Sequence, residues 1–396
     1  MLSKAEQTGE KMHIAVKLFG AGALALLAGC STLSSLNPFA RKAPPLNPPA
    51  ALVEFKPTLT ARTVWSTAVG SATTHAFAPA VANGSVFAAS ADGSLMRIDA
   101  ASGAVVWRIK ADSPLTAGVG TDGETVAVAG EKGELLVFDG NGKFRWKAQA
   151  SSEILSAPAV GRGMVIVRSL DNHVAAYDAG SGTRRWLIQR SIPSLTLRAA
   201  PGIVISGDTA FVALPGGRLS ALALGNGGPR WEVAIGDPRG TTELERIADA
   251  SGTPVIVDDE VCAVAYQGRI GCFDINSGSA RWFKEFSSYV GVAANQRFVF
   301  AADERGAVNA FARQSGAGAW RNDKLAFRRL TTPASFGRAV AVGDYQGYVH
   351  FLSQEDGSFT ARIGTDGSPV LAAPVVAGNN LVVQTQAGAV VALSID

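Results

Sequence analysis

The segments Leu135-Leu-Val-Phe-Asp-Gly-Asn-Gly-Lys-Phe-Arg-Trp146 and Val174-Ala-Ala-Tyr-Asp-Ala-Gly-Ser-Gly-Thr-Arg-Arg-Trp186 share one frame. In both, a run of apolar residues ends in Asp, a Gly follows within a few residues, and Trp stands four positions after that Gly. Asp bonds to the local backbone and Gly adopts a positive φ, so the Asp-to-Gly stretch predicts a hairpin turn between two short strands.

This frame recurs along the chain with a period of about 40 residues, and its tryptophans are Trp65, Trp107, Trp146, Trp186, Trp231, Trp282 and Trp320. A second Gly-containing turn precedes each frame, as at Asp92-Gly93 and Gln267-Gly268, so each unit holds about four short strands. Four strands per period indicate a propeller blade rather than a helical repeat. We expect each Trp to pack between blades and to donate its N–H to the backbone of a neighbouring blade.

The number of units predicts the number of blades. Six units run from Trp to Trp, and a seventh runs from Trp320 to Ala361, where Ala replaces Trp. The last segment, up to Asp396, supplies three more strands, and the strand around Trp65 lacks a unit of its own. Joining them in one blade predicts an all-β, eight-bladed propeller of four-stranded antiparallel blades over residues 59–396, closed by its N- and C-terminal strands. Closure would remove free sheet edges.

Composition excludes several other classes. The 396 residues include 44 Gly, 47% are hydrophobic and 17% are charged, against about 25% charged in an average soluble protein. This profile excludes disordered, coiled-coil and collagen-like chains, and the net charge of +3 does not indicate a nucleic-acid partner. Four scattered histidines and three cysteines have no metal-ligand spacing, so we expect no metal and no cofactor.

The N-terminus has the pattern of an export signal. Residues 18–29 are an apolar run that is too short to span a bilayer, and Leu27-Ala-Gly-Cys30 resembles a bacterial lipobox. We therefore expect residues 1–29 to be a signal peptide, with Met1 or Met12 as the start, and Cys30 to carry lipid. Residues 30–58 hold six of the eighteen prolines and are predicted to form an extended tether. Ser31 after the lipidated Cys is typical of routing to the outer membrane, where the chain would be anchored on the periplasmic face.

Cys262 and Cys272 flank a hairpin with Gln267-Gly268 at its tip, which places them opposite each other on paired strands. Export permits a disulfide between them, and two buried thiols remain the alternative. Either interpretation is structural.

The motif Ala/Val-x-Asp-x-x-x-Gly-x-x-x-Trp resembles the pyrroloquinoline-quinone-type repeat over residues 65–396. Together with the lipobox, it is similar to the propeller lipoprotein family of the bacterial outer-membrane β-barrel assembly (BAM) machinery. That resemblance implies a non-enzymatic scaffold that binds the POTRA domains of the barrel subunit BamA and other subunits. It also implies action on unfolded outer-membrane proteins, with the lipid as the only membrane contact.

Two segments, 194–198 and 240–254, are similar to the family's loops that contact BamA; the residues this implies are Leu195, Leu197, Arg198, Glu243, Arg246 and Asp249. Ser251 stands where the family often has a second acidic residue. The spacing of Trp and Pro gives an independent reason to expect binding residues in these segments. The distance from the repeat Trp to the following Pro is increased at Pro201 and Pro254, so insertions fall in two consecutive blades and lie on the same rim of the propeller. The alternative for the two leucines is ordinary strand core.

Two other functions remain open. A periplasmic quinone-type enzyme is disfavoured because the chain has no adjacent cysteines, no Cys-x-x-Cys-His and no loop that gathers Ca²⁺ ligands. A propeller of the same kind could also serve another envelope complex.

Overall fold

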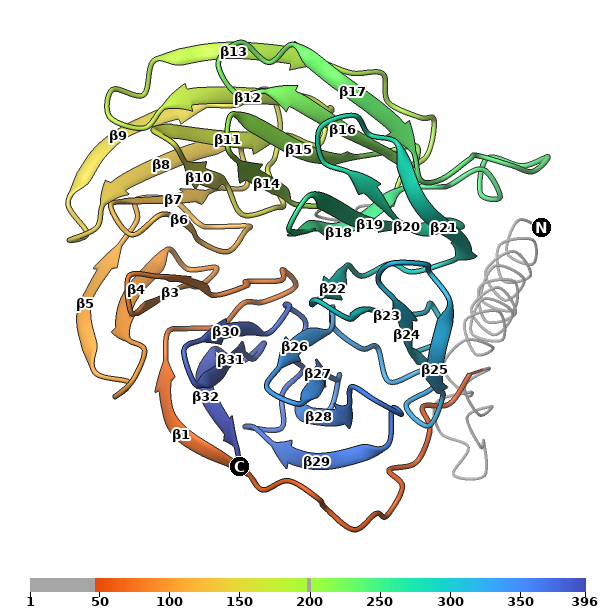
Figure 1. The fold of residues 1–396 in the computed structure, drawn as a ribbon. Helices are drawn as coiled ribbons and strands as arrows, with labels where there is room; N and C mark the ends of the chain where they lie inside the picture. Colours follow the sequence, from red (N-terminus) through yellow and green to blue (C-terminus); the bar gives the residue numbers. More distant parts are fainter. Residues whose placement is uncertain (1–46, 198–200) are drawn as a thin grey trace, which may run out of the picture. The chain divides into compact units, whose positions relative to one another are not determined.

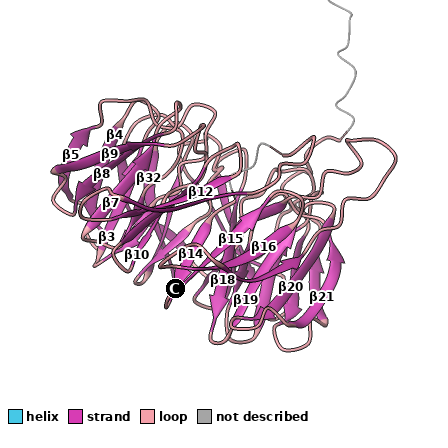
Figure 2. Ribbon diagram, turned by 90° about the horizontal axis from the view of Figure 1, so that it is seen from above, coloured by secondary structure: helices cyan, strands magenta, loops and turns pink. Residues whose placement is uncertain are grey.

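The computed structural model describes residues 47–197 and 201–396 of the chain. The chain divides into two compact units, residues 1–48 and 49–396, and the second contains every strand described below. The predicted signal peptide, Cys30 and Arg198 lie outside the described residues. The described residues form strands and loops without a helix (Figure 2), so none of them belongs to a helix long and apolar enough to cross a membrane.

Thirty-two strands form eight four-stranded sheets, which we number as blades 1 to 8 in chain order (Figure 1). Blades 1 to 4 consist of β2 (Ala80–Ala82), β3 (Ser85–Ala89), β4 (Ser94–Asp99) and β5 (Val105–Lys110); β6 (Gly120–Thr121), β7 (Thr125–Ala129), β8 (Glu134–Asp139) and β9 (Phe144–Gln149); β10 (Ala159–Gly161), β11 (Met164–Arg168), β12 (His173–Asp178) and β13 (Arg184–Gln189); and β14 (Ile203–Ser206), β15 (Thr209–Leu214), β16 (Arg218–Ala223) and β17 (Pro229–Ala234). Blades 5 to 8 consist of β18 (Ala250–Val257), β19 (Glu260–Ala265), β20 (Gly268–Asp274) and β21 (Ala280–Phe286); β22 (Val292–Ala294), β23 (Phe298–Ala302), β24 (Val308–Ala312) and β25 (Gly318–Asn322); β26 (Ala334–Phe336), β27 (Ala339–Gly343), β28 (Tyr348–Ser353) and β29 (Phe359–Gly364); and β30 (Val375–Ala377), β31 (Asn380–Gln384), β32 (Ala389–Ile395) and β1 (Ala61–Ala68).

The ring closes as the repeat count predicts. Blade 8 has the strand order β1-β32-β31-β30, in which β1 pairs antiparallel with the C-terminal strand from Ala61 opposite Ile395. The first strand of each blade contacts the first strand of the next, and β30 contacts β2, which completes the cycle. The prediction of an eight-bladed propeller is confirmed.

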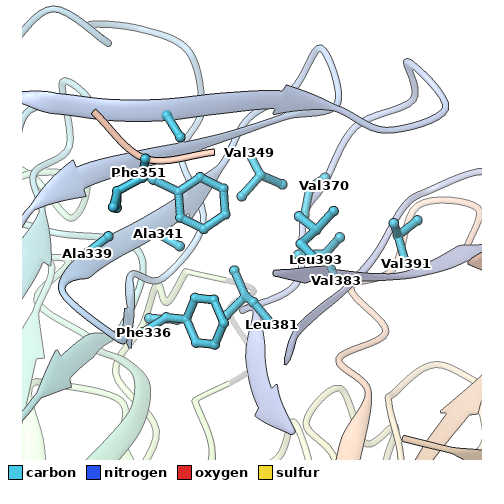
Figure 3. Packing of buried hydrophobic residues seen from close by; sticks show 13 residues of the cluster. Phe336, Ala339, Ala341, Val349, Phe351, Val370, Leu381, Val383, Val391 and Leu393 are labelled. Atoms are coloured by element: carbon cyan, nitrogen blue, oxygen red, sulfur yellow. The ribbon is translucent and has the colours of Figure 1, made fainter. Parts of the chain in front are cut away.

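The hydrophobic core lies between blades rather than within them. Each of the eight buried clusters takes residues from two adjacent blades; in Figure 3, Phe336 and Phe351 of blade 7 pack with Leu381 and Val383 of blade 8. The second strand of a blade is therefore covered on both faces and is typically a continuous apolar run, as in the fully buried β23. The fourth strand has one exposed edge and alternates, as in β13.

Each tryptophan joins its blade to the next one in the same way. Trp146 donates its indole N–H to the carbonyl of Ala179 at 2.9 Å, just beyond the Asp that ends the third strand of blade 3. All seven tryptophans make the equivalent bond, to Ala100, Gly140, Ala179, Leu224, Ile275, Arg313 and Gln354 in turn. The expectation that a neighbouring blade supplies the N–H partner is confirmed.

The structure also explains the Trp missing from the seventh repeat. The fourth strand of blade 7 faces blade 8, where the chain termini replace the hairpin turn on which a Trp would pack. Leu59 occupies the core there beside Ala361, and the N–H groups of Thr58 and Leu59 both donate to the carbonyl of Thr360. Ala361 is small because the entering chain needs that space.

Residues 50–58 differ from the prediction of a free tether up to residue 58. The ring of Phe55 stacks on Phe359 with centroids 5.3 Å apart, and Val53 packs on the core between blades 6 and 7. Arg328 donates to the carbonyl of Ala50 at 2.9 Å, and Arg362 to that of Val53 at 3.1 Å. Apolar residues among the prolines bind residues 50–58 to the propeller, so this part of the predicted tether belongs to the folded unit.

The antiparallel order of strands gives the propeller two distinct faces. One face carries the loops that join the fourth strand of a blade to the first strand of the next, together with the turns between second and third strands. We call it the loop face. The other, the turn face, carries the Asp-to-Gly hairpins and therefore all the tryptophan N–H bonds.

Candidate protein-binding surface

Two loops on the loop face are the longest connections between blades: residues 190–202 join blade 3 to blade 4, and residues 235–249 join blade 4 to blade 5. They contain the two insertions expected from the Pro spacings. The second loop follows β17 and protrudes from the propeller in Figure 1. Loops extended on a rigid scaffold are the usual place for binding residues.

Asp249 joins the two loops. One oxygen of its carboxylate accepts the backbone N–H of Leu197 at 2.5 Å, and the other accepts that of Gly216 at 2.8 Å, in the neighbouring turn of blade 4. Burial raises the pKa of Asp249, while these two bonds and the positive charge of Arg168 oppose that rise. Asp249 is only 3% exposed, so in the free chain it orders the loops from within and is not itself a contact surface.

The loop after β17 is ordered by a carboxylate of its own. Glu245 accepts the N–H groups of Thr241 and Thr242 at 2.8 and 3.0 Å, and these bonds hold its pKa at about 2. Arg246 donates to the carbonyl of Gly240 at 3.1 Å and lies 3.5 Å from the carboxylate of Glu243. Both predicted residues, Glu243 and Arg246, are exposed at the tip of this loop.

The predicted leucines lie in the first loop and not in a strand. Leu195 is 43% exposed, and Leu197 is half-buried and held by Asp249. The structure therefore does not support the alternative that both are strand core. Arg198 follows them outside the described residues.

Sequence reasoning missed two exposed apolar residues on the same loops. Leu244 is 69% exposed, the highest value among the large exposed hydrophobic residues of the described chain, and Ile192 is 49% exposed. Because Leu244 stands between Glu243 and Glu245, it belongs to no apolar pattern in the sequence. Leu195 and Arg246 are also exposed on these loops, and we call the four residues the docking surface: Ile192, Leu195, Leu244 and Arg246. Apolar anchors beside an Arg are typical of interface hot spots.

The cysteines belong to the core. Cys262 and Cys272 are opposite each other in β19 and β20, are fully buried, and are joined by a disulfide with Cα atoms 4.1 Å apart. With Glu260 they form the one group of three adjacent metal-ligand side chains among the described residues. Because the two sulfur atoms are bonded to each other and Glu260 pairs with Arg313 at 3.1 Å, the group stabilises the contact between blades 5 and 6.

Comparison with known proteins agrees with this architecture. The family model for outer membrane protein assembly factor BamB matches residues 52–114, 91–322 and 304–396. Proteins of that name from Burkholderia pseudomallei and Bordetella pertussis are 45% and 42% identical to this chain, each over 93% of it and over 95% and 94% of their own lengths.

Among solved structures, BamB from Moraxella catarrhalis superposes with a TM-score of 0.77 at 26% identity, over 85% of this chain and 100% of that one. A quinohemoprotein alcohol dehydrogenase from Pseudomonas putida shares the fold at 13% identity, with a TM-score of 0.64. The sequence match over nearly the whole length, together with the eight blades, decides between these relatives: the chain belongs to the family of outer membrane protein assembly factor BamB.

Proposed function

We propose that this chain is a non-enzymatic scaffold lipoprotein of the outer-membrane β-barrel assembly complex, which binds the POTRA domains of BamA through the docking surface and assists insertion of barrel proteins. The main support for the proposal is that Asp249 holds the two extended loops together through hydrogen bonds and that Leu195 and Leu244 are exposed on these loops. A buried carboxylate that orders both loops lowers the entropy lost when a partner binds.

The family supports the assembly role, and the residues support the absence of catalysis. The described carboxylates with lowered pKa values, such as Asp178 and Asp274, accept bonds from the turn residues Ser181 and Ser277. These two carboxylates close hairpin turns. The quinone-dependent relatives share only the fold at 13% identity.

We further propose that Cys30 carries the lipid after removal of residues 1–29, and that residues 30–49 are the tether to the periplasmic face of the outer membrane. Unfolded outer-membrane proteins would be the substrates of the assembled complex. Mass spectrometry of the mature N-terminus tests the lipid: an acylated Cys30 is expected, and an unmodified one would refute the anchor.

The docking proposal is tested by co-purification of the full-length tagged chain from detergent-solubilised outer membrane. Leu195→Asp with Leu244→Asp should remove BamA, because truncating a hot-spot residue costs about 2 kcal/mol or more, about 30-fold in affinity. Val106→Asp is the matched control, since Val106 is 54% exposed on β5 in blade 1, away from both loops.

Three outcomes separate the candidates. Loss of BamA with the double variant and retention with the control supports the docking surface. Retention of BamA with both variants would move the interface elsewhere. Recovery of a different envelope complex by the unaltered chain would favour the second candidate function.

A further inference from the structure

Arg168 is a buried cation without a hydrogen-bond partner among the described residues. It is the last residue of β11, is 5% exposed, and its Nε is fully enclosed with no acceptor. The other two buried arginines of the described chain are fully engaged: Arg328 binds Asp344 at 2.7 Å and Arg313 binds Glu260 at 3.1 Å. Buried charges are normally both paired and hydrogen-bonded, so Arg168 is an exception.

The carboxylate of Asp249, which interacts electrostatically with Arg168, does not supply the missing hydrogen bond. Burial lowers the pKa of Arg168 to about 10, and the negative charge of Asp249 opposes that shift, so the guanidinium stays charged at neutral pH. The two oxygens of Asp249 accept the N–H groups of Leu197 and Gly216, and the Nε of Arg168 is bonded to neither of them. Asp249 therefore stabilises the charge of Arg168 while the N–H donors of Arg168 remain available.

Arg168 faces a small cavity between the two docking loops. Its lining also includes Leu197, Pro201, Pro215 and Asp249, and the volume is about 10 Å³. A cavity of about this volume holds a single water molecule, and therefore one oxygen atom of a ligand. Two neighbours on the same edge of blade 3, the Oδ1 of Asn172 and the Nε of Arg190, are also buried and lack partners among the described residues.

We infer that Arg168 is a specificity-determining residue of the docking surface and receives one carboxylate oxygen of an Asp or Glu side chain of the docking partner. This inference rests on the proposed function, because it places the contact between the same two loops. A carboxylate fits better than a phosphate: the cavity admits one oxygen, and the adjacent charge of Asp249 would repel a phosphate dianion more strongly than a singly charged carboxylate. A charge-assisted bond to a desolvated guanidinium is also among the stronger contacts an interface can make.

The test uses the full-length protein and purified POTRA domains of BamA as the probe. Arg168→Met keeps the volume and removes the charge. Arg168→Met leaves the carboxylate of Asp249 bonded to the N–H groups of Leu197 and Gly216, so its melting temperature should fall less than that of a variant that breaks a hydrogen-bonded ion pair. Affinity for the POTRA domains should fall by at least about 30-fold and depend less on salt.

Arg328→Met is the control for a structural arginine. It removes the guanidinium that pairs with the buried carboxylate of Asp344 and leaves His350 as the remaining side-chain partner, so its melting temperature should fall. A comparable fall for Arg168→Met would show that Arg168 is structural and would overturn the inference. Binding of Arg168→Met with unchanged affinity would overturn it as well, while leaving the docking proposal intact.

The partner's residue is identified by a double-mutant cycle. Acidic residues of the POTRA domains are changed one at a time to Ala, and one of them should weaken binding to the unaltered chain but not to Arg168→Met. If every acidic substitution acts equally on both chains, the carboxylate assignment is refuted. If the unaltered chain does not bind POTRA domains at all, the proposed function fails first, and the inference falls with it.

Discussion

Replacing Gly182 by Ala should test how the blades are held together. Gly182 lies in the Asp-to-Gly turn of blade 3 with φ of 72°, directly against Trp146 of blade 2. A Cβ atom placed there would lie 2.6 Å from the Cδ2 atom of that indole. The same turn supplies the carbonyl of Ala179 that accepts the indole N–H.

Three contributions determine how much Gly182→Ala lowers the free energy of unfolding. A left-handed Ala costs about 1–2 kcal/mol, of which about 0.4–1 is returned by the smaller entropy of the unfolded chain. The overlap with Trp146 requires a shift of about 1 Å to restore an ordinary carbon contact, and overpacking of this kind costs about 1–3 kcal/mol. Weakening the indole bond adds about 1 kcal/mol. We expect Gly182→Ala to cost about 2–6 kcal/mol in the free energy of unfolding.

Gly163 provides the matched control within the same blade. Its φ is 74°, but a Cβ atom there has nothing within 4 Å. Gly163→Ala should therefore cost only the backbone strain, about 1 kcal/mol. Unfolding in guanidinium chloride, followed by tryptophan fluorescence, measures both variants. Equal costs at the two positions would refute the claim that the glycine is kept for the tryptophan of the preceding blade.

Three further results are expected. Phe55→Ala removes the ring stacked on Phe359 and should release the segment before β1 to limited proteolysis while the blades stay resistant; unchanged cleavage would contradict its role as an anchor. Ala361→Trp restores the repeat pattern but collides with the space of Leu59, so it should lower the melting temperature, and an increase would contradict our account of the closing blade. Glu245 has a pKa lowered from 4.5 to about 2, so its contribution to loop order is present above pH 4.5 and is lost as pH falls toward 2. The protection factor of the Thr241 amide, its exchange rate relative to that of an unfolded chain at the same pH, should fall over that range, and a constant protection factor would refute the capping role.

The sequence was sufficient for the fold because its signals are local and repeated. The Trp of one unit packs on the Gly of the next unit and bonds to the carbonyl of the residue after that unit's Asp, so all three positions take part in the contacts between blades. The pattern therefore records the geometry in every unit. The exception at Ala361 also marks the place where the ring closes, because blade 8 has no hairpin turn between its third and fourth strands on which a Trp could pack.

The candidate surface could be only partly predicted. The insertions before Pro201 and Pro254 located the loops, because length is visible in sequence. The burial of Asp249 depends on tertiary hydrogen bonds to Leu197 and Gly216, and the exposure of Leu244 depends on a turn capped by Glu245. None of these has a periodic signal. The same holds for residues 50–58, whose prolines suggested a free tether although Val53 and Phe55 anchor them.

The propeller has two faces, and the repeat motif and the proposed docking residues lie on different ones. Every described tryptophan bond reaches a carbonyl at the turn face, so the contacts that join the blades fix the sequence there. The docking loops leave from the opposite face, where lengthening a connection disturbs no such bond. Blades 3 to 5 can therefore carry insertions and a buried, unpaired Arg168 without weakening the contacts that hold the ring together. Because of this separation, we expect substitutions at the docking surface to change binding while leaving the unfolding transition of the blades in place.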